Sequence, residues 1–252
     1  MTVTTLAVFC VLLIGLPKYG ETINKLPPYI SPCRQDDPKL GDCILKNAKA
    51  TLPKVINGEP KYRVPNLDPL LITELKLRQG TDSVGLKLAW KNAEFHGLKS
   101  VQPLSCEAST KTRHIKFEVF VPQISITGTY SATGRVLLLP VTGSGPSNIT
   151  VQNMKVTYEM GWDVVKKNGK DYMDIVNNKI TLRDIGFMTM KFENFFNGDR
   201  ILGGNMNRFL NENWKELAKE FGPGVADAMG EVFLLLSRRI SEIVPYDIIF
   251  KS

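Results

Sequence analysis

An apolar stripe at helical spacing near the carboxyl terminus constrains the fold more than any other feature of this 252-residue sequence. Between residues 203 and 244, apolar side chains recur three or four positions apart, and the stripe keeps its phase across Gly222-Pro223-Gly224. A helical hairpin would not need a common phase, so we expect one long helix, kinked or briefly broken at Pro223 and ended by Pro245. If fully helical, it would be roughly 60 Å long.

The second half of this helix carries four consecutive apolar residues, Phe233-Leu234-Leu235-Leu236. A helix that is apolar all round is buried on most of its sides. We therefore expect this segment to face the interior of the protein.

The middle of the chain, residues 67–196, has a different pattern in which apolar and polar residues alternate in several runs. Alternation of this kind predicts half-buried β-strands. After the longest run, Asn168-Gly169 predicts a hairpin turn, followed by a return strand over residues 172–176 and a further strand over residues 179–182. The apolar face of the longest run is formed by Met154, Val156, Tyr158, Met160, Trp162 and Val164.

These two patterns fit together in one architecture, because a long sheet with one apolar face needs a partner and a long apolar helix needs a cover. We predict an α+β fold in which a long, curved antiparallel β-sheet wraps around a long carboxyl-terminal α-helix. The molecule would be elongated, with an internal apolar tunnel that binds a ligand. The candidate ligand-binding residues are Val156, Tyr158, Met160, Trp162, Phe233 and Leu236.

Tyr158 is the candidate polar contact within this apolar face. A buried phenol needs a hydrogen-bond partner. In a filled core the partner is usually a backbone carbonyl, whereas in a carrier it could be an oxygen of the ligand. The sequence leaves both alternatives open.

The amino terminus has the character of a targeting segment. Residues 6–16 form an apolar run that is too short to span a bilayer, which needs about 20 residues. The run suits the central region of a secretory signal peptide, although no Lys or Arg precedes it. An uncleaved anchor or a buried strand is the alternative. We expect a signal peptide over residues 1–20, a single domain over residues 21–252, and secretion into an extracellular fluid.

Secretion determines how the cysteines are interpreted. Cys33 and Cys43 flank a turn-forming segment, and a local disulfide between them is the simplest pairing in an oxidising compartment. Cys106 is then free, buried and inert. Asn148 begins an Asn-Ile-Thr glycosylation sequon in a Gly-, Pro- and Ser-rich stretch, which predicts a surface loop.

Residues for known catalytic and metal chemistry are scarce. The chain has two histidines and lacks nucleophile-elbow, zinc-protease, Cys/His zinc and phosphate-loop motifs. We therefore expect no enzyme activity, metal or cofactor. The net charge of +7 is a mild excess that does not indicate nucleic-acid binding. Beyond the amino terminus no apolar segment is long enough for stable membrane insertion.

Several segments resemble the insect takeout and haemolymph juvenile-hormone-binding protein family, in order and over nearly all of the mature chain. They are the Cys33 and Cys43 pair, PNLDPLLITELKL, ITGTYSATGRVLLLPVTGSG, FLNENWKEL and VPYDIIF. The resemblance implies the same sheet-around-helix fold. It also implies a carrier, secreted into haemolymph or tissue fluid, with a channel for juvenile hormone, other terpenoids or fatty-acid-like lipids. Takeout-type members are associated with circadian output and feeding.

One departure from that pattern bears on the ligand. The hormone carriers have a second disulfide in their carboxyl-terminal half, and this chain has no cysteine after Cys106. It is therefore more similar to the takeout branch, and juvenile hormone is one candidate ligand among several. The alternative functions are an extracellular interaction protein with a filled core, acting through its basic surface, and a secreted hydrolase. No receptor or protein partner is indicated.

Overall fold

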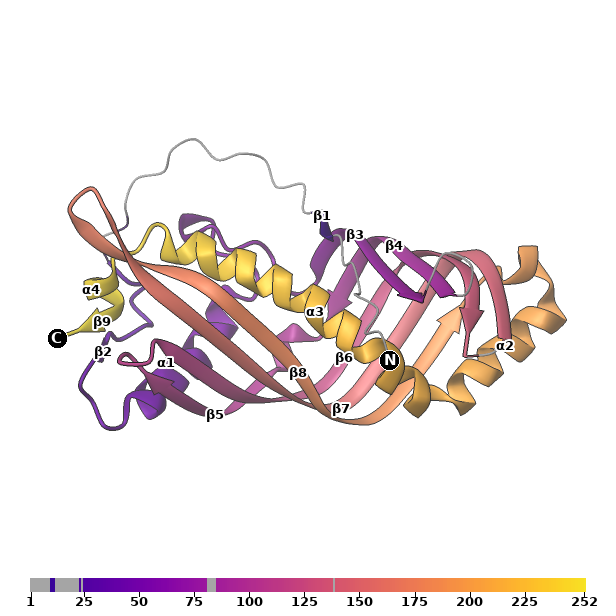
Figure 1. Ribbon diagram of the computed structural model, residues 1–252, viewed down its shortest axis with the longest axis horizontal. Coiled ribbons are helices and arrows are strands. Elements are labelled where there is room, and N and C mark those ends of the chain that lie inside the picture. Colours follow the sequence, from indigo (N-terminus) through magenta and orange to yellow (C-terminus); the bar gives the residue numbers. More distant parts are fainter. Residues whose placement is uncertain (1–9, 12–22, 24, 81–84, 138) are drawn as a thin grey trace.

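A computed structural model describes residues 10–11, 23, 25–80, 85–137 and 139–252. The molecule is elongated, and helix α3 (Trp214–Ser241) lies along the inside of a long, curved antiparallel sheet (Figure 1). This arrangement confirms the predicted fold. The sheet has the order β1-β3-β4-β6-β7-β8, and β5 also pairs with β6. Its strands are β1 (Cys10–Val11), β3 (Leu70–Gly80), β4 (Gly85–His96), β5 (Gln102–Ser109), β6 (His114–Val136), β7 (Leu139–Lys167) and β8 (Lys170–Phe192).

The length of the central strands allows the sheet to curve around the helix. β7 has 29 residues, which is roughly 95 Å along its path. β6 pairs with β5 over residues 114–120 and with β4 over residues 125–134, so its two halves have different neighbours. Bulges between β7 and β8 bend the sheet further, because an extra residue on one strand increases the local twist.

The hairpin predicted at Asn168-Gly169 is confirmed, since β7 ends at Lys167 and β8 begins at Lys170. Both turn residues have positive φ, as a two-residue hairpin turn of this kind requires. The predicted separation into strands at 172–176 and 179–182 is wrong. β8 runs through this region, because Val176 is accommodated as the extra residue of a bulge opposite Gly161 and Trp162.

The carboxyl-terminal helix is divided at a different place from the one we predicted. α2 (Arg200–Glu212) and α3 meet at Asn213, whereas Pro223 lies inside α3. The Asn213 side chain donates to the carbonyl of Phe209 at 2.7 Å, and an asparagine that bonds to nearby backbone competes with helix continuation. Pro223 removes a single backbone N–H donor from α3. The helix continues because it packs against β8 both before and after Pro223. α3 ends at Ser241, and Pro245 precedes the short helix α4 (Tyr246–Ile249).

Two asparagines of α2 hydrogen-bond to the outer edge of β8, the last strand of the sheet. The Met190 N–H donates to Oδ1 of Asn211 at 2.8 Å, and Nδ2 of Asn211 donates to the Met190 carbonyl at 2.7 Å. Asn207 makes the same pair of bonds with Phe192, at 2.9 and 2.8 Å. These amides therefore occupy the place of a neighbouring strand, and they satisfy edge groups that would otherwise need another partner.

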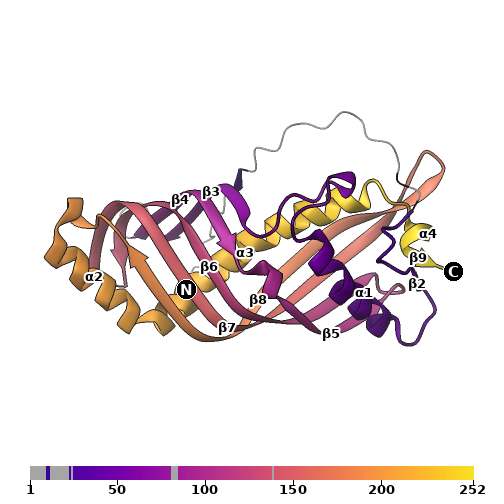
Figure 2. The same ribbon diagram turned by 180° about the vertical axis from the view of Figure 1, so that it is seen from behind.

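A second core lies at the end of the molecule opposite α2, where a segment near residue 33 meets the carboxyl-terminal segment. β2 (Cys33–Arg34) pairs in parallel with β9 (Phe250–Lys251), and Cys33 forms a disulfide with Cys43 of α1 (Leu40–Val55). α1 lies along β5, as Figure 2 shows from behind. The second core consists of Cys33, Leu40, Ile115, Trp162, Met173, Ile175, Leu234 and Phe250.

Cys106 is free and half-buried on β5, beside α1. Burial raises the pKa of its thiol to about 12, so the thiol stays protonated and weakly nucleophilic near neutral pH. α1 approaches closely here, since a Cβ on Gly41 would meet the Cys106 carbonyl oxygen at 2.1 Å. Only glycine fits at that position.

The surface loop predicted around Asn148 is wrong. Asn148 lies within β7 and is paired with Thr127 of β6 and Lys191 of β8. Its side chain is exposed on the outer side of the sheet. The Gly, Pro and Ser residues that indicated a loop are accommodated in a strand because β6 pairs with the whole stretch and β8 pairs with it from Ser147 onward.

The amide contacts to β8 lead to a stability prediction. Asn211→Ala leaves the Met190 N–H and carbonyl without these partners, so the free energy of unfolding should fall by about 1–3 kcal/mol. Urea denaturation measures it. Asn205→Ala is the matched control, because Asn205 is exposed on the same helix, and it should change stability by less than about 0.5 kcal/mol. Equal effects of the two substitutions would contradict the assigned role of Asn211.

Candidate ligand-binding cavity

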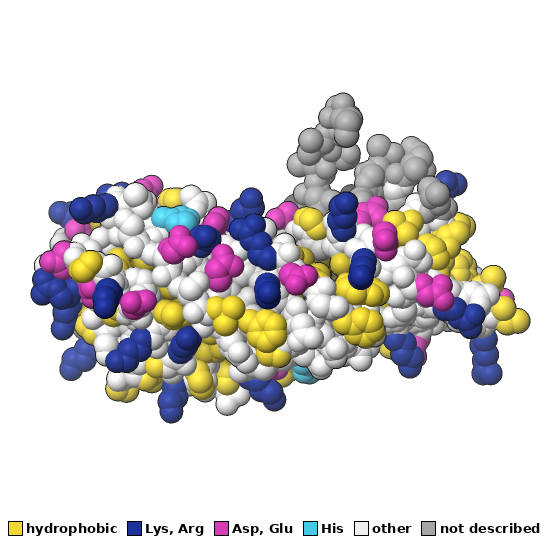
Figure 3. Space-filling view, turned by 90° about the horizontal axis from the view of Figure 1, so that it is seen from below, with side chains coloured by type: hydrophobic (Ala, Val, Ile, Leu, Met, Phe, Trp, Pro, Cys, Tyr) yellow, Lys and Arg dark blue, Asp and Glu magenta, His cyan; other side chains and the backbone are white. Residues whose placement is uncertain are grey.

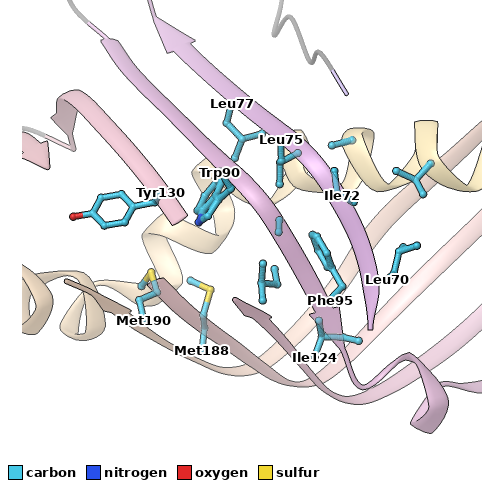
Figure 4. Packing of buried hydrophobic residues seen from close by; sticks show 14 of the residues in the cluster. Leu70, Ile72, Leu75, Leu77, Trp90, Phe95, Ile124, Tyr130, Met188 and Met190 are labelled. Atoms are coloured by element: carbon cyan, nitrogen blue, oxygen red, sulfur yellow. The ribbon is translucent and has the colours of Figure 1, made fainter. Parts of the chain in front are cut away.

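A cavity of about 430 Å³ lies between the inner face of the sheet and helix α3. This volume is within the range of small-molecule sites, about 300–1,000 Å³. Figure 4 shows part of its wall, where Trp90 and Phe95 of β4 lie across the interior from Met188 and Met190 of β8. Each of these strands contributes alternate residues, because successive side chains of a strand point to opposite faces of the sheet.

The cavity is elongated along the helix. Its α3 wall extends from Leu217 to Phe233, a distance of roughly 24 Å at 1.5 Å per residue. Small residues at four-residue spacing, Ala218, Gly222 and Ala226, form part of this wall. They leave volume that larger side chains would fill, so the space follows directly from the composition of this helix face.

Three elements, β7, β8 and α3, end their contribution to the cavity wall at the same end of the cavity. Tyr158 is the last lining residue of β7, and its partner across the ladder, Ile180, is the first lining residue of β8. Phe233 is the last on α3, and its ring centroid lies 6.1 Å from that of Tyr158. The second core, which includes Trp162, begins further along β7 and bounds the cavity here.

The wall of the cavity is almost entirely apolar. Among the described residues, the lining side chains that carry nitrogen or oxygen are Trp90, Tyr130 and Tyr158. Trp90 Nε1 donates to Ser147 Oγ at 3.0 Å, and the Tyr130 hydroxyl donates to the Glu193 carbonyl at 2.8 Å. Burial raises the pKa of Tyr130 to about 12. These two polar groups are therefore already satisfied by the protein.

The Tyr158 hydroxyl differs from them. It is buried and has no hydrogen-bond partner within the part of the chain that the structure describes. The backbone-carbonyl partner expected for a tyrosine in a filled core is thus not found at this position. A buried hydroxyl without a partner carries a desolvation cost of about 1–3 kcal/mol, which a ligand oxygen placed next to it would offset.

The structure brings three of the six predicted site residues to the cavity wall, Val156, Tyr158 and Phe233. Met160 and Trp162 lie beyond its end, where Trp162 stacks on Phe250 with ring centroids 5.9 Å apart. Leu236 is buried in the main core but does not line the cavity, because it lies about one helical turn beyond Phe233, the last lining residue of α3. Leu235, in the segment expected to be enclosed, is 38% exposed.

Most of the remaining wall comes from residues that we did not select from the sequence. β4 and β6 contribute a continuous apolar surface, of which Leu86, Leu88 and Trp90 are one part. The alternating pattern of this run would have placed those three side chains on one face. It did not indicate that the face borders a cavity. Lining residues from these strands and β3 include Leu75, Leu77, Phe95, Val119, Val121, Ile124, Ile126 and Tyr130.

Among the described residues, no group of three or more His, Cys, Asp or Glu side chains is placed to hold a metal ion. No described helix has both the length and the apolar character required to cross a bilayer.

Comparison with known proteins identifies the family. A model of the haemolymph juvenile hormone binding protein family matches residues 5–251. The chain belongs to this family. The predicted takeout and juvenile-hormone-binding resemblance is thereby confirmed, and the members of the family are binding proteins. Membership and the cavity together indicate a protein that binds hydrophobic ligands.

Individual relatives support this placement. The circadian clock-controlled protein daywake of Drosophila yakuba is 24% identical over 257 residues, covering 98% of each chain. A putative beta-carotene-binding protein of Schistocerca gregaria is 21% identical over 201 residues, covering 79% of each chain. The crystal structure of Takeout 1 from Epiphyas postvittana matches with a TM-score of 0.77 and 25% identity, covering 88% of this chain and 99% of that one.

The different positions of Leu236 and Met229 on α3 lead to a prediction for this family member. Leu236→Ala should lower the free energy of unfolding by about 2–5 kcal/mol, because it leaves a hole in a packed core. Its affinity for an apolar fluorescent probe should stay nearly unchanged. Met229→Ala, at the cavity wall, should lose less stability and change probe affinity more. Denaturation and probe titration of both variants measure this, and a reversed pattern would contradict the assigned cavity boundary.

Proposed function

We propose that this protein is a secreted carrier that binds a long hydrophobic ligand, with one polar group, in an internal tunnel formed by the cavity. Apolar burial would supply most of the affinity, at about 25 cal/mol for each Å² of ligand surface removed from water. The single observation that carries the proposal is the long apolar cavity, at one end of which lies Tyr158, whose buried hydroxyl has no hydrogen-bond partner among the described residues. A few polar groups in an apolar pocket are what orients a ligand.

The ligand class we propose is juvenile hormone, another terpenoid or a fatty-acid-like lipid. Each combines a long apolar body with polar oxygen at one end or is wholly apolar. The family description names juvenile hormone, and one relative's name refers to beta-carotene, another long apolar molecule. The proposal includes a role in circadian or feeding regulation, and the names of two relatives as clock-controlled proteins support the circadian part.

Secretion is part of the proposal. Most of the expected signal peptide, residues 1–20, lies outside the described residues, and only Cys10–Val11 is described, paired with β3 at Leu75 and Glu74. The Cys33–Cys43 disulfide supports an oxidising compartment. Asn148, exposed on β7, is the proposed glycosylation site.

The alternative function, an interaction protein acting through a basic surface, is less well supported. Figure 3 shows one face of the molecule, on which Lys and Arg side chains are interspersed with Asp and Glu. Interspersed charges of both signs give a weaker field than a patch of one sign. The cavity, by contrast, gives the carrier a specific place for a ligand.

Lipid extraction from the purified, secreted protein tests the carrier. Mass spectrometry should find a long apolar molecule in a molar ratio near one, and the intact mass should correspond to a chain that begins near Glu21. Ala218→Phe places a phenyl ring in the space next to the cavity wall, and the packed side chains around it cannot move enough to restore that space. The amount of bound lipid should therefore fall at least about tenfold. Ala50→Phe, on the exposed side of α1, is the control. Equal lipid content in both variants would contradict binding in the cavity.

A second prediction concerns the ligand's polar group. Tyr158→Phe keeps the ring and removes the hydroxyl, so affinity for the extracted ligand should fall about fivefold, since a neutral hydrogen bond contributes about 0.5–1.5 kcal/mol net. Stability without ligand should barely change, because the hydroxyl has no partner among the described residues. Tyr130→Phe is the matched control, whose hydroxyl bonds to Glu193, and it should show the opposite pattern. A stability loss in Tyr158→Phe with unchanged affinity would assign Tyr158 to the core.

A further inference from the structure

The end of the molecule at which α2 begins exposes apolar side chains together with arginines. We propose that this end is a docking surface for lipid bilayers that contain anionic phospholipids. We call it the α2 tip, and it consists of the described residues of the β6–β7 hairpin from 135 to 139 together with residues 199–208. Docking does not require a ligand in the cavity, so it is independent of the proposed carrier function.

The two parts of the α2 tip lie at one end of the molecule because the chain follows β7 after β8 has ended. Nδ2 of Asn194 donates to the Ser144 carbonyl of β7 at 2.8 Å. The chain therefore continues along β7 in the direction of Leu139, the first residue of that strand, before α2 begins at Arg200. Figures 1 and 2 both show α2 and the start of β7 at the same end.

Three large apolar side chains of the α2 tip face solvent. Ile201 is 76% exposed, Leu202 is 51% exposed and Leu139 is 39% exposed, whereas α2 buries Met206 and Leu210 in the main core. Single exposed apolar residues are common, but three at one end of an elongated molecule can enter the surface of a bilayer together. The other exposed large apolar side chains of the described chain are distributed over β3, β5, β8 and α3: Leu71, Leu104, Val176, Phe187 and Leu235.

The same two segments carry an excess of positive charge. Arg135, Arg200 and Arg208 are exposed, and none of them forms an ion pair with a described residue. Asp199 is the acidic residue of the tip, and its Oδ1 accepts the Ile201 N–H at 2.9 Å. At the right-hand end of Figure 3, which α2 forms, hydrophobic side chains lie beside Lys and Arg side chains. An anionic bilayer attracts such a surface, and arginine stems can lie against acyl chains while the guanidinium groups stay among the phosphates.

This charge favours a bilayer over a second copy of the chain as the partner. In a symmetric dimer one surface patch faces itself, so the arginines of both copies would lie close together and repel. The area that three apolar side chains offer is also small for a stable protein interface. Phospholipid phosphates, by contrast, are counter-charges for every arginine of the tip.

Docking at the α2 tip would place the bilayer next to the cavity. Val136 and Val141, on either side of the turn between β6 and β7, line the cavity, and so do Phe195 before α2 and Leu210 within it. In a carrier, as proposed above, a ligand that leaves the cavity at this end would enter the bilayer directly.

Vesicle flotation of the purified protein without added ligand tests the docking. Affinity should be at least about tenfold higher for vesicles of phosphatidylcholine and phosphatidylserine than for phosphatidylcholine alone, since each arginine near an anionic surface contributes about fivefold. Added salt should release the protein, because the Debye length falls from about 10 Å at 0.1 M to about 3 Å at 1 M. Equal binding to both kinds of vesicle, or binding to neither, would overturn the proposal.

Leu202→Ser tests the apolar part of the tip. It should lower the affinity for the anionic vesicles at least about fivefold, because it removes apolar surface that enters the bilayer. Leu104→Ser is the matched control, since Leu104 is also 51% exposed but lies on β5, which pairs with the opposite half of β6. Equal losses in the two variants would contradict docking through the tip.

Arg200→Gln combined with Arg208→Gln tests the charge. This variant should lose at least about tenfold in affinity for the anionic vesicles and change little with phosphatidylcholine. Lys46→Gln combined with Lys49→Gln is its control, because it removes the same charge from exposed positions of α1, and its effect should be less than about twofold. The reverse order of effects would place the docking surface on α1 and overturn the proposal.

Two further measurements separate the alternatives. Light scattering without vesicles should find a monomer, and a dimer that Leu202→Ser dissociates would assign the tip to a second copy of the chain and overturn docking. Lipid extraction reports on the carrier alone. Vesicle binding by a protein that contains no extracted lipid supports docking and contradicts the carrier, whereas extracted lipid without vesicle binding does the reverse.

Discussion

The structure depends on removing one long apolar helix from water. α3 buries one side, which includes Leu217, Val232 and Leu236, against the concave face of the sheet, and its opposite side is exposed. A sheet can cover so long a helix only if its strands are long, and β6, β7 and β8 have 23, 29 and 23 residues. The gap between the sheet and the helix is not filled everywhere. Where α3 presents Ala218, Gly222 and Ala226, the gap is the cavity.

A sheet that wraps without closing on itself leaves an edge, and the way this edge is satisfied also shapes the cavity. Asn207 and Asn211 hydrogen-bond to the backbone of Phe192 and Met190, and the side chains of both strand residues line the cavity. The same contacts therefore protect the edge strand from other partners and hold part of the wall in place. A substitution that destabilises this edge should therefore also lower the affinity for a ligand.

The three described lining side chains that carry nitrogen or oxygen differ in whether they have hydrogen-bond partners. Trp90 and Tyr130 are satisfied by Ser147 and Glu193, and Tyr158 is not satisfied by any described residue. One polar group without a partner among the described residues therefore belongs to a residue at one end of a long apolar space.

The sequence by itself determined the fold class, because period-2 and period-3.6 patterns report directly which face of a strand or helix is apolar. It also indicated the hairpin at Asn168-Gly169 and the Cys33–Cys43 disulfide, which depend on local geometry. Only the tertiary structure decided that α3 continues through Pro223 and that β8 is continuous between residues 176 and 179, because packing against β8 and pairing with β7 outweigh the local signals at these positions. It likewise decided that Trp90 and Tyr130 have hydrogen-bond partners, since these partners lie 57 and 63 residues away in sequence, whereas the Tyr158 hydroxyl has none among the described residues.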